Sequence, residues 1–295
     1  MRTLTILIAF VLFSNSTVAQ SDLLSLVDKP GEKRKKEYIS NAFKSARVIN
    51  GHSMEMVGKG VLDLRILHRF GSITSGFSNL FGLDQANMRF GFDYGVTKNF
   101  TIGIGRSNVG KEWDGFLKLR PVWQSKGGRW PSPVSVILIT GATYNSAAWP
   151  DPNRKNYTTS RMAFYNEIII GKKFGERFSL QLAPTFVHRN LVATSSDSNN
   201  LYALGVGARF KLSKRTAFVV DYHYLAWGID KTKYKDPLSV GFDIETGGHV
   251  FQLHFSNSVG MNEKAFLTGT TNSWEKTEIR FGFNMSRVFT VRKKH

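Results

Sequence analysis

The chain has 295 residues, with 40 lysines and arginines, 22 aspartates and glutamates, and no cysteine. The lack of cysteine excludes disulfides, thiolate metal sites and lipid attachment through a cysteine. A formal charge of +18 suggests nucleic acid as the partner of a cytoplasmic protein, but in an exported protein it favours anionic lipid headgroups or lipopolysaccharide.

The N-terminus predicts a cleaved signal peptide over residues 1–19. Arg2 precedes an apolar run, residues 4–13, that is too short to span a bilayer as a mature helix. Small residues at Thr17 and Ala19 suit signal peptidase, so we expect cleavage after Ala19. An N-terminal membrane anchor is the alternative, but no stop-transfer pattern follows. The sequence therefore predicts export, and with it no role in binding nucleic acid.

Residues 20–58 differ from the rest of the mature chain. They begin with a basic stretch, KRKK at 33–36, and continue as a mixed sequence with several glycines. They show none of the regular alternation that follows them, so we assign them to a separate N-terminal segment.

From residue 61 onward, apolar and polar residues alternate, as in ANMRFGFDYG at 86–95. Alternation at every second residue predicts strands with one apolar face. We predict twelve strands, at 61–68, 86–94, 99–107, 114–124, 133–144, 160–172, 177–190, 200–212, 215–225, 238–246, 248–257 and 277–289.

Long and short connections alternate between these strands, as they do between the two ends of an outer-membrane barrel. The connection SKGGRWPS at 125–132 shows the weakest contrast. All six tryptophans fall at strand ends or in connections, where aromatic girdles lie. We therefore predict that residues 59–290 form an all-β, antiparallel up-and-down transmembrane β-barrel of about 12 strands. A soluble β-sandwich or a periplasmic lipid-carrier barrel would not explain the alternating connections.

An even number of strands places both termini in the periplasm. Residues 20–58 are then either a periplasmic extension, which could bind a periplasmic protein partner, or a plug that enters the barrel. Residues 291–295 form a basic C-terminal tail. The sequence leaves the choice between extension and plug open.

Several stretches resemble one known family. They include HRFG at 68–71, FGLDQAN at 81–87, PLSVGFDIETGGHVFQLHFSNS at 237–258 and RFGFNMSRVF at 280–289. Together they are similar to a family of uncharacterised Gram-negative outer-membrane β-barrel proteins, a domain of unknown function. The resemblance runs from about residue 42 to residue 289. It implies a barrel in the cell outer membrane, in contact with outer-membrane lipid, and brings no catalytic residues. The end of the last strand is also similar to the signal read by barrel-assembly machinery, which is therefore an expected partner.

Strand parity predicts which charged side chains face the lumen. In a narrow barrel we expect many of these charges to pair across the interior. We predict no metal site and no cofactor. The predicted lumen-lining residues are Asp63, Arg65, Arg89, Asp93, Lys118, Arg120, Glu167, Arg209, Asp221, His223, Asp243, Glu245, His254 and Arg280.

A catalytic alternative rests on HFSN at 254–257. It is similar to the His-x-Ser-Asn string of outer-membrane lipid A deacylases and phospholipases, in which a histidine activates a serine. His254 and Ser256 share one face of a strand. The third group that should orient the histidine is missing, because Thr268 stands at the expected distance in a loop. We interpret the stretch as a hairpin, turning at Gly247 and Gly248, whose second strand forms inner wall.

The sequence thus predicts a barrel that is not an enzyme. The first expectation is a narrow pore for small polar or ionic solutes, with the basic excess favouring anions. The second is a non-conducting barrel that serves as a subunit or anchor of an envelope complex. The third is a barrel-embedded acyl hydrolase that uses His254 and Ser256.

Overall fold

Twelve antiparallel strands close into a barrel in the computed structural model, which describes residues 35–291 apart from 150, 154, 193 and 196. The predicted signal peptide, residues 20–34 and the tail from residue 292 lie outside the described residues. Each predicted strand overlaps an observed one, which confirms the fold class. The barrel strands are β2 (Val61–Ser72), β3 (Ala86–Thr97), β4 (Phe100–Ser107), β5 (Glu112–Val122), β7 (Ser135–Asn145), β8 (Met162–Lys173), β9 (Phe178–Arg189), β10 (Asn200–Lys211), β11 (Thr216–Trp227), β12 (Leu238–Thr246), β13 (His249–Ser256) and β14 (Arg280–Thr290).

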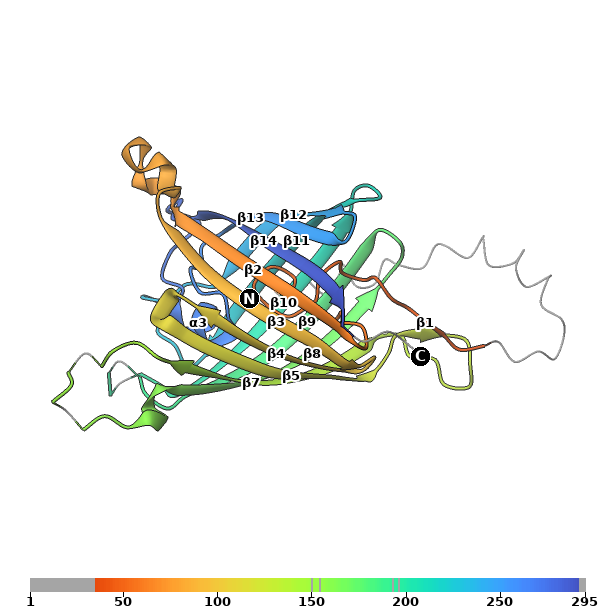
Figure 1. Cartoon of the computed structure of the whole chain (residues 1–295), viewed down its shortest axis with the longest axis horizontal. Helices are drawn as coiled ribbons and strands as arrows, with labels where there is room; N and C mark the ends of the chain where they lie inside the picture. The colour runs from red at the N-terminus through yellow and green to blue at the C-terminus, as the bar shows by residue number, and fades with distance from the viewer. Residues whose placement is uncertain (1–34, 150, 154, 193, 196, 292–295) are drawn as a thin grey trace, which may run out of the picture.

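The barrel closes where β14 pairs with β2, and every other strand pairs with its neighbours in chain order (Figure 1). The first strand is longer than predicted and continues to Ser72, since it stays paired with β14 there. The last strand begins at Arg280 rather than at residue 277. Thr277 has a φ of 60°, in a turn closed by its N–H on the Trp274 carbonyl, so the extended backbone cannot start earlier.

The connection with the weakest length contrast has a structural reason. Between β5 and β7 it forms a short strand, β6 (Ser125–Lys126), which pairs with β1 (Glu37–Tyr38) of the N-terminal segment. This small sheet lies outside the barrel, at the end with the short connections (Figure 1). A connection that would otherwise be a tight turn is therefore long because it holds the incoming chain.

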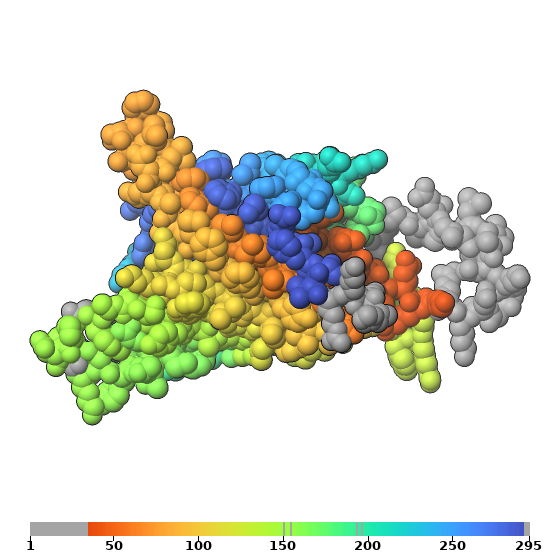
Figure 2. Space-filling view, viewed as in Figure 1, coloured from red at the N-terminus to blue at the C-terminus, as the bar shows by residue number. Residues whose placement is uncertain are grey.

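The long connections project from the opposite end. Between β2 and β3, the 3₁₀ turns η1 (Ile73–Ser75) and η2 (Phe77–Gly82) stand clear of the wall (Figure 2). Two further 3₁₀ turns lie in connections at this end, η3 (Val109–Lys111) between β4 and β5 and η4 (Thr158–Arg161) between β7 and β8. Within the described residues, no helix is long and apolar enough to cross a bilayer.

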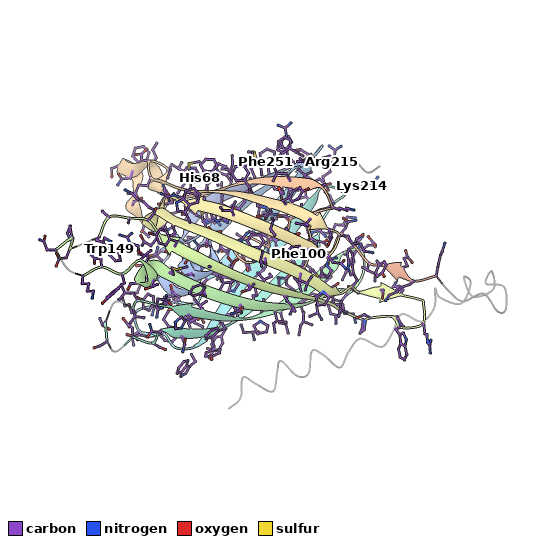
Figure 3. The ribbon with its side chains drawn as sticks, turned by 60° about the horizontal axis from the view of Figure 1, so that its bottom comes forward. His68, Phe100, Trp149, Lys214, Arg215 and Phe251 are labelled. Carbon is purple, nitrogen blue, oxygen red and sulfur yellow. The ribbon has the colours of Figure 1, made fainter. Side chains whose placement is uncertain are left out.

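The outer wall is apolar, and the charged residues of the strands face inward, beside buried apolar residues such as Ile137 and Ile169. On β8, Phe164, Ile168 and Ile170 are exposed on the outside, whereas Glu167 is buried inside. Side chains cover the outer wall along the strands, with Phe100 and Phe251 marked in Figure 3. Burial of the charged face and exposure of the apolar face are the reverse of a soluble barrel and suit a bilayer.

Two segments enter the barrel. From the end with the short connections, residues 41–58, here called the plug, run through the interior, and Phe43, Val48, Ile49 and Met54 are buried there. From the other end, the connection between β13 and β14 contributes the helix α3 (Glu263–Gly269), with Phe266 buried. The interior core therefore consists of wall, plug and α3 together.

Candidate functional site

The predicted wall residues surround the plug. Twelve of the fourteen are buried, and the other two, Glu245 and Arg280, are half-buried near the strand ends. Glu245 forms an ion pair with Lys44 of the plug, with 2.6 Å between Oε2 and Nζ. Arg280 donates to the Phe70 carbonyl at 3.4 Å. The candidate functional site is therefore the set of contacts between the wall and the plug.

One carboxylate on β11 binds three consecutive backbone amides of the plug. Asp221 Oδ2 accepts from the N–H groups of Ile49, Asn50 and Gly51, at 3.2, 2.7 and 3.0 Å. Its other oxygen lies 2.9 Å from His223 Nε2. A Cβ at Gly51 would stand 3.0 Å from the His223 ring, so glycine allows the turn to approach the carboxylate. The carboxylate of a wall strand thus accepts hydrogen bonds from backbone N–H groups of the plug, and these bonds join the two segments.

The opposite wall binds the plug through carbonyl groups. On β5, Lys118 Nζ donates to the carbonyl oxygens of Ser53 and Glu55, at 2.7 and 2.6 Å, and to that of Ala46 at 3.3 Å. Arg120 donates to the Met54 carbonyl at 2.6 Å. A buried lysine needs hydrogen-bond acceptors for its charged group, and these carbonyl oxygens supply them.

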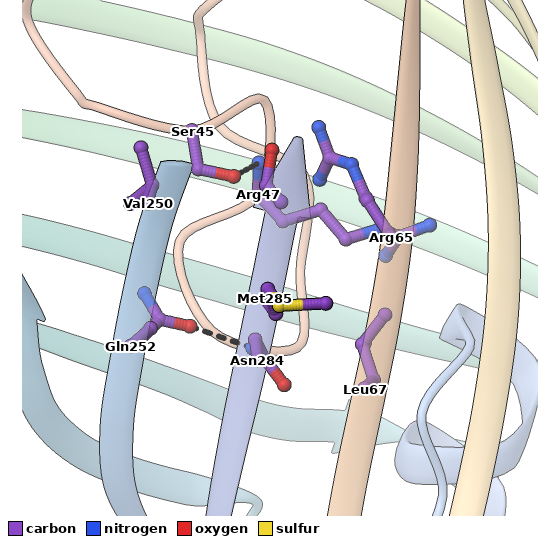
Figure 4. A pocket seen from close by; sticks show the side chains of 9 residues that line it. Ser45, Arg47, Arg65, Leu67, Val250, Gln252, Asn284 and Met285 are labelled. Carbon is purple, nitrogen blue, oxygen red and sulfur yellow. Dashed lines mark hydrogen bonds between the residues drawn. The ribbon is translucent and has the colours of Figure 1, made fainter. Parts of the chain in front are cut away.

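Amide side chains complete the ring of contacts. Gln181 on β9 accepts from the Met54 N–H at 2.8 Å and donates to the His52 carbonyl at 2.6 Å. Asn284 on β14 donates to the Ile49 carbonyl at 3.0 Å and to Gln252 at 2.6 Å (Figure 4). The predicted lumen-lining residues do not include Gln181 and Asn284, although the parity of both residues places them on the inner face.

The plug and α3 meet at a buried ion pair. Arg47 Nη1 lies 2.7 Å from Glu263 Oε1, and both side chains are almost fully buried. The same nitrogen donates to the Asn50 carbonyl at 2.6 Å. Burial, and then the positive charge of Arg47, lowers the pKa of His52 well below its usual range, so this ring is neutral near pH 7. Segments entering from the two ends thus hold each other inside the lumen.

The wall charges pair differently from the prediction. We expected pairs across the open interior, but the plug occupies that space. Arg89 instead pairs with Asp114, two strands away, with 2.8 Å between Nε and Oδ1. Arg65 contacts Asp63 at 3.0 Å on its own strand and Asp93 at 3.1 Å on the next one. Charges therefore pair along the wall or bind the plug.

Two hollows of very different size lie between the plug and the wall. The hollow where the plug faces β2, β13 and β14 has a volume of about 20 Å³, enough for about one water molecule (Figure 4). A second hollow, lined by Lys44 and Glu55 of the plug and by Glu245 and Val288 of the wall, has a volume of about 280 Å³. The plug and α3 therefore occupy the interior of the barrel without filling it.

The catalytic alternative gains no support from the geometry. Ser256 is bonded to Ser239, with 2.7 Å between the hydroxyl oxygens, and accepts from the Ser258 N–H at 3.0 Å. Within the described residues neither ring nitrogen of His254 has a hydrogen-bond partner, so His254 does not contact the serine through one. Thr268 donates to the Lys264 carbonyl at 2.8 Å. The described part of the chain also holds no group of three histidines and carboxylates placed for a metal ion.

A sequence model of one protein family, described as a membrane bound beta barrel domain (DUF5777), matches residues 43–289. A comparison with curated proteins found no match.

Solved structures with a similar barrel include the NanC porin, with 7% identity and a TM-score of 0.47, over 77% of this chain and 98% of that one. OmpF of Salmonella typhi, solved in complex with daunomycin, has 8% identity and a TM-score of 0.35, over 78% and 97%. The translocator domain of the autotransporter NalP from Neisseria meningitidis has 10% identity and a TM-score of 0.36, over 80% and 89%. At these values the similarities say nothing about what the present barrel binds or transports.

Proposed function

Since this chain belongs to the family of membrane bound beta barrel domains (DUF5777), we propose that it is an outer-membrane barrel closed by its own N-terminal segment. It serves as the membrane anchor of an envelope complex and presents the residues before the plug to a periplasmic partner. The observation that carries this proposal is the plug itself, which is bonded to the wall on several sides. Asp221, Lys118 and Gln181, from three separate strands, each bind two or three of its backbone groups.

The end with the short connections supports a partner site. Glu37 and Tyr38 are exposed in β1, just before the chain enters the barrel, and are held by β6. Lys36 and Lys98 both lie over the Tyr38 ring, 5.5 and 5.7 Å from its centroid. A positively charged surface with an exposed aromatic residue suits an acidic protein surface. Outer-membrane lipid and lipopolysaccharide surround the barrel in this proposal, and barrel-assembly machinery inserts it.

A second candidate function is a pore that opens when the plug leaves. The observation that favours it is the wall behind the plug, where buried charged side chains such as Lys118 and Asp221 stand beside apolar ones. Among the fourteen predicted wall positions, lysines and arginines are as numerous as aspartates and glutamates, so the charges of this wall give no preference for anions.

Single-channel conductance in planar bilayers separates the two candidates. The mature chain should not conduct, and a variant lacking residues 20–58 should. A variant lacking only residues 20–34 keeps the plug and is the matched control; it should stay silent. Heat-modifiable mobility on gels checks that each variant forms a barrel. Steady conductance of the mature chain would exclude a barrel that is closed at rest.

The anchor role needs its own test. A photo-crosslinking residue in place of Tyr38 should form an adduct with an envelope protein in intact cells. The same residue in place of Phe77, at the other end of the barrel, is the control and should not form that adduct. Absence of any adduct at position 38 would reject the partner site.

A further inference from the structure

Three cationic side chains converge at the end with the long connections. Arg161 ends η4, Arg189 ends β9 and Lys264 lies in α3, yet all three line one hollow of about 310 Å³. Trp149 lines the same hollow and marks this end of the barrel in Figure 3, opposite Lys214. We call it the cationic hollow.

No acidic side chain balances these charges within the cationic hollow. Among the described residues that line it there is no aspartate or glutamate. Lys264 pairs with Glu112, which lines an adjoining hollow of about 340 Å³. Neither Arg161 nor Arg189 forms an ion pair within the described part of the chain. Arg189 also lines the adjoining hollow with Glu112, but not at ion-pair distance from it. An anion that contacts both guanidinium groups would be attracted by both.

The structure holds the two arginines in place before any ligand binds. Arg161 lies over the Trp149 ring, 3.7 Å from its centroid, and donates to the Asn145 carbonyl at 2.8 Å. Arg189 donates through Nη2 to the Ser198 carbonyl at 2.6 Å. Guanidinium groups fixed in this way bind carboxylates and phosphates with little further loss of side-chain freedom.

The rest of the lining limits the kind of anion. Trp149 and Leu191 add apolar surface, and Asn145 adds a polar group. Arg189 has the parity of the buried, inward-facing Val187, and Lys264 belongs to the helix inside the barrel, so the hollow lies within the rim. A volume of about 310 Å³ is at the small end of the range for ligand sites. We propose that the cationic hollow binds a small soluble organic anion, whose carboxylate or phosphate lies between Arg161 and Arg189.

Isothermal titration calorimetry on the mature chain in detergent tests this site. The probes are benzoate and phenyl phosphate, with benzyl alcohol as the neutral probe of similar shape. Both anions should bind, more weakly at high salt, and benzyl alcohol should not. Arg189→Gln and Arg161→Gln should each weaken binding at least tenfold. The matched control is Arg106→Gln, because Arg106 also stacks on a tryptophan, Trp113 at 5.4 Å, but does not line the hollow.

Each outcome decides the proposal. Loss of binding in the Arg161 and Arg189 variants, with Arg106→Gln unchanged, supports it. Equal binding of benzyl alcohol, or binding that persists in Arg189→Gln, overturns it. Lipopolysaccharide micelles form a separate arm, since a lipid headgroup carries the same phosphate chemistry. If only the micelles bind in an Arg189-dependent manner, the soluble ligand is the wrong assignment. None of these results depends on whether the lumen conducts, so this proposal can fail or stand independently of the closed-barrel anchor.

Discussion

Replacing Asp221 with asparagine should loosen the plug without breaking the barrel. The carboxylate accepts three backbone amides of the plug, at Ile49, Asn50 and Gly51. Asparagine keeps one acceptor oxygen but loses the charge. Hydrogen bonds to charged groups contribute about 1.5–3 kcal/mol each, and neutral ones about 0.5–1.5 kcal/mol. A loss of about 1 kcal/mol on each of three bonds gives about 3 kcal/mol, which corresponds to roughly a hundredfold rise in the undocked population.

The assay uses the absence of cysteine from the native sequence. Ala46→Cys places a single thiol on the plug, at a position that is buried while the plug is docked. Its rate of reaction with a maleimide then follows the undocked fraction. The Asp221→Asn variant should label roughly a hundred times faster than the Ala46→Cys parent, as the free-energy difference requires.

A matched control separates docking from general damage. Asp230 lies in an exposed loop and accepts from the Thr232 N–H at 2.8 Å. Asp230→Asn changes the charge equally and should leave the labelling rate unchanged. If Asp221→Asn labels within about threefold of its parent while heat-modifiable mobility shows an intact barrel, the amides are not held by this carboxylate and the reasoning is refuted.

Three further changes test the wall, the hairpin turn and the contact between plug and α3. Leu182→Arg, in the middle of the lipid-facing side of β9, should cost about 2–4 kcal/mol in barrel unfolding, against about 0–1 kcal/mol for Val96→Arg near a strand end; equal costs in a urea titration would contradict the membrane assignment. Gly248→Val should lower the free energy of barrel unfolding by about 1–2 kcal/mol, because φ is 106° there, a backbone conformation that a β-branched residue rarely adopts. No neighbouring atom would clash with the added side chain, so this backbone strain is the whole cost. Unchanged thermal unfolding would show that the turn adapts. Arg47→Met should destabilise plug docking by about 3–5 kcal/mol, because it leaves Glu263 buried without its partner, and adding Glu263→Gln should restore part of that free energy. If the two free-energy losses, measured from labelling rates of the Ala46→Cys thiol, simply add, the pair is not coupled.

The barrel could be predicted from the sequence because the bilayer imposes a simple rule on every strand. Arg280 and Phe281 are neighbours, and only one parity lets the charged residue avoid lipid. Because charged side chains must avoid lipid in every strand, errors in the prediction are confined to the strand ends. Thr277 shows such an error, since a single residue with positive φ ended the strand where side-chain alternation continued.

The position of the plug could not be predicted, for a different physical reason. Residues 41–58 have no periodicity, because they are neither helix nor sheet and most of their polar contacts use the backbone. Every sequence has backbone N–H and carbonyl groups, so no residue type in the plug indicates these contacts. Helix α3 left a better signal: Asn262 is an N-cap that accepts from the Ala265 N–H at 2.8 Å. The position of α3 inside the barrel could not be predicted, because Glu263 pairs with Arg47, which lies far away in the chain.

Closure of the lumen is therefore specified more by the wall than by the plug. Of the plug side chains, Lys44 pairs with Glu245, and Arg47 and His52 contact Glu263. Glu55 lies 3.9 Å from Arg120, and Asn50 donates to Ser239 at 3.0 Å and accepts from Arg69 at 2.7 Å. The other main contacts join wall side chains to plug backbone. A plug of different sequence could dock equally well if it kept these few polar side chains and the freedom of Gly51. A change of Asp221 on the wall, by contrast, removes several contacts at once, whatever the sequence of the plug.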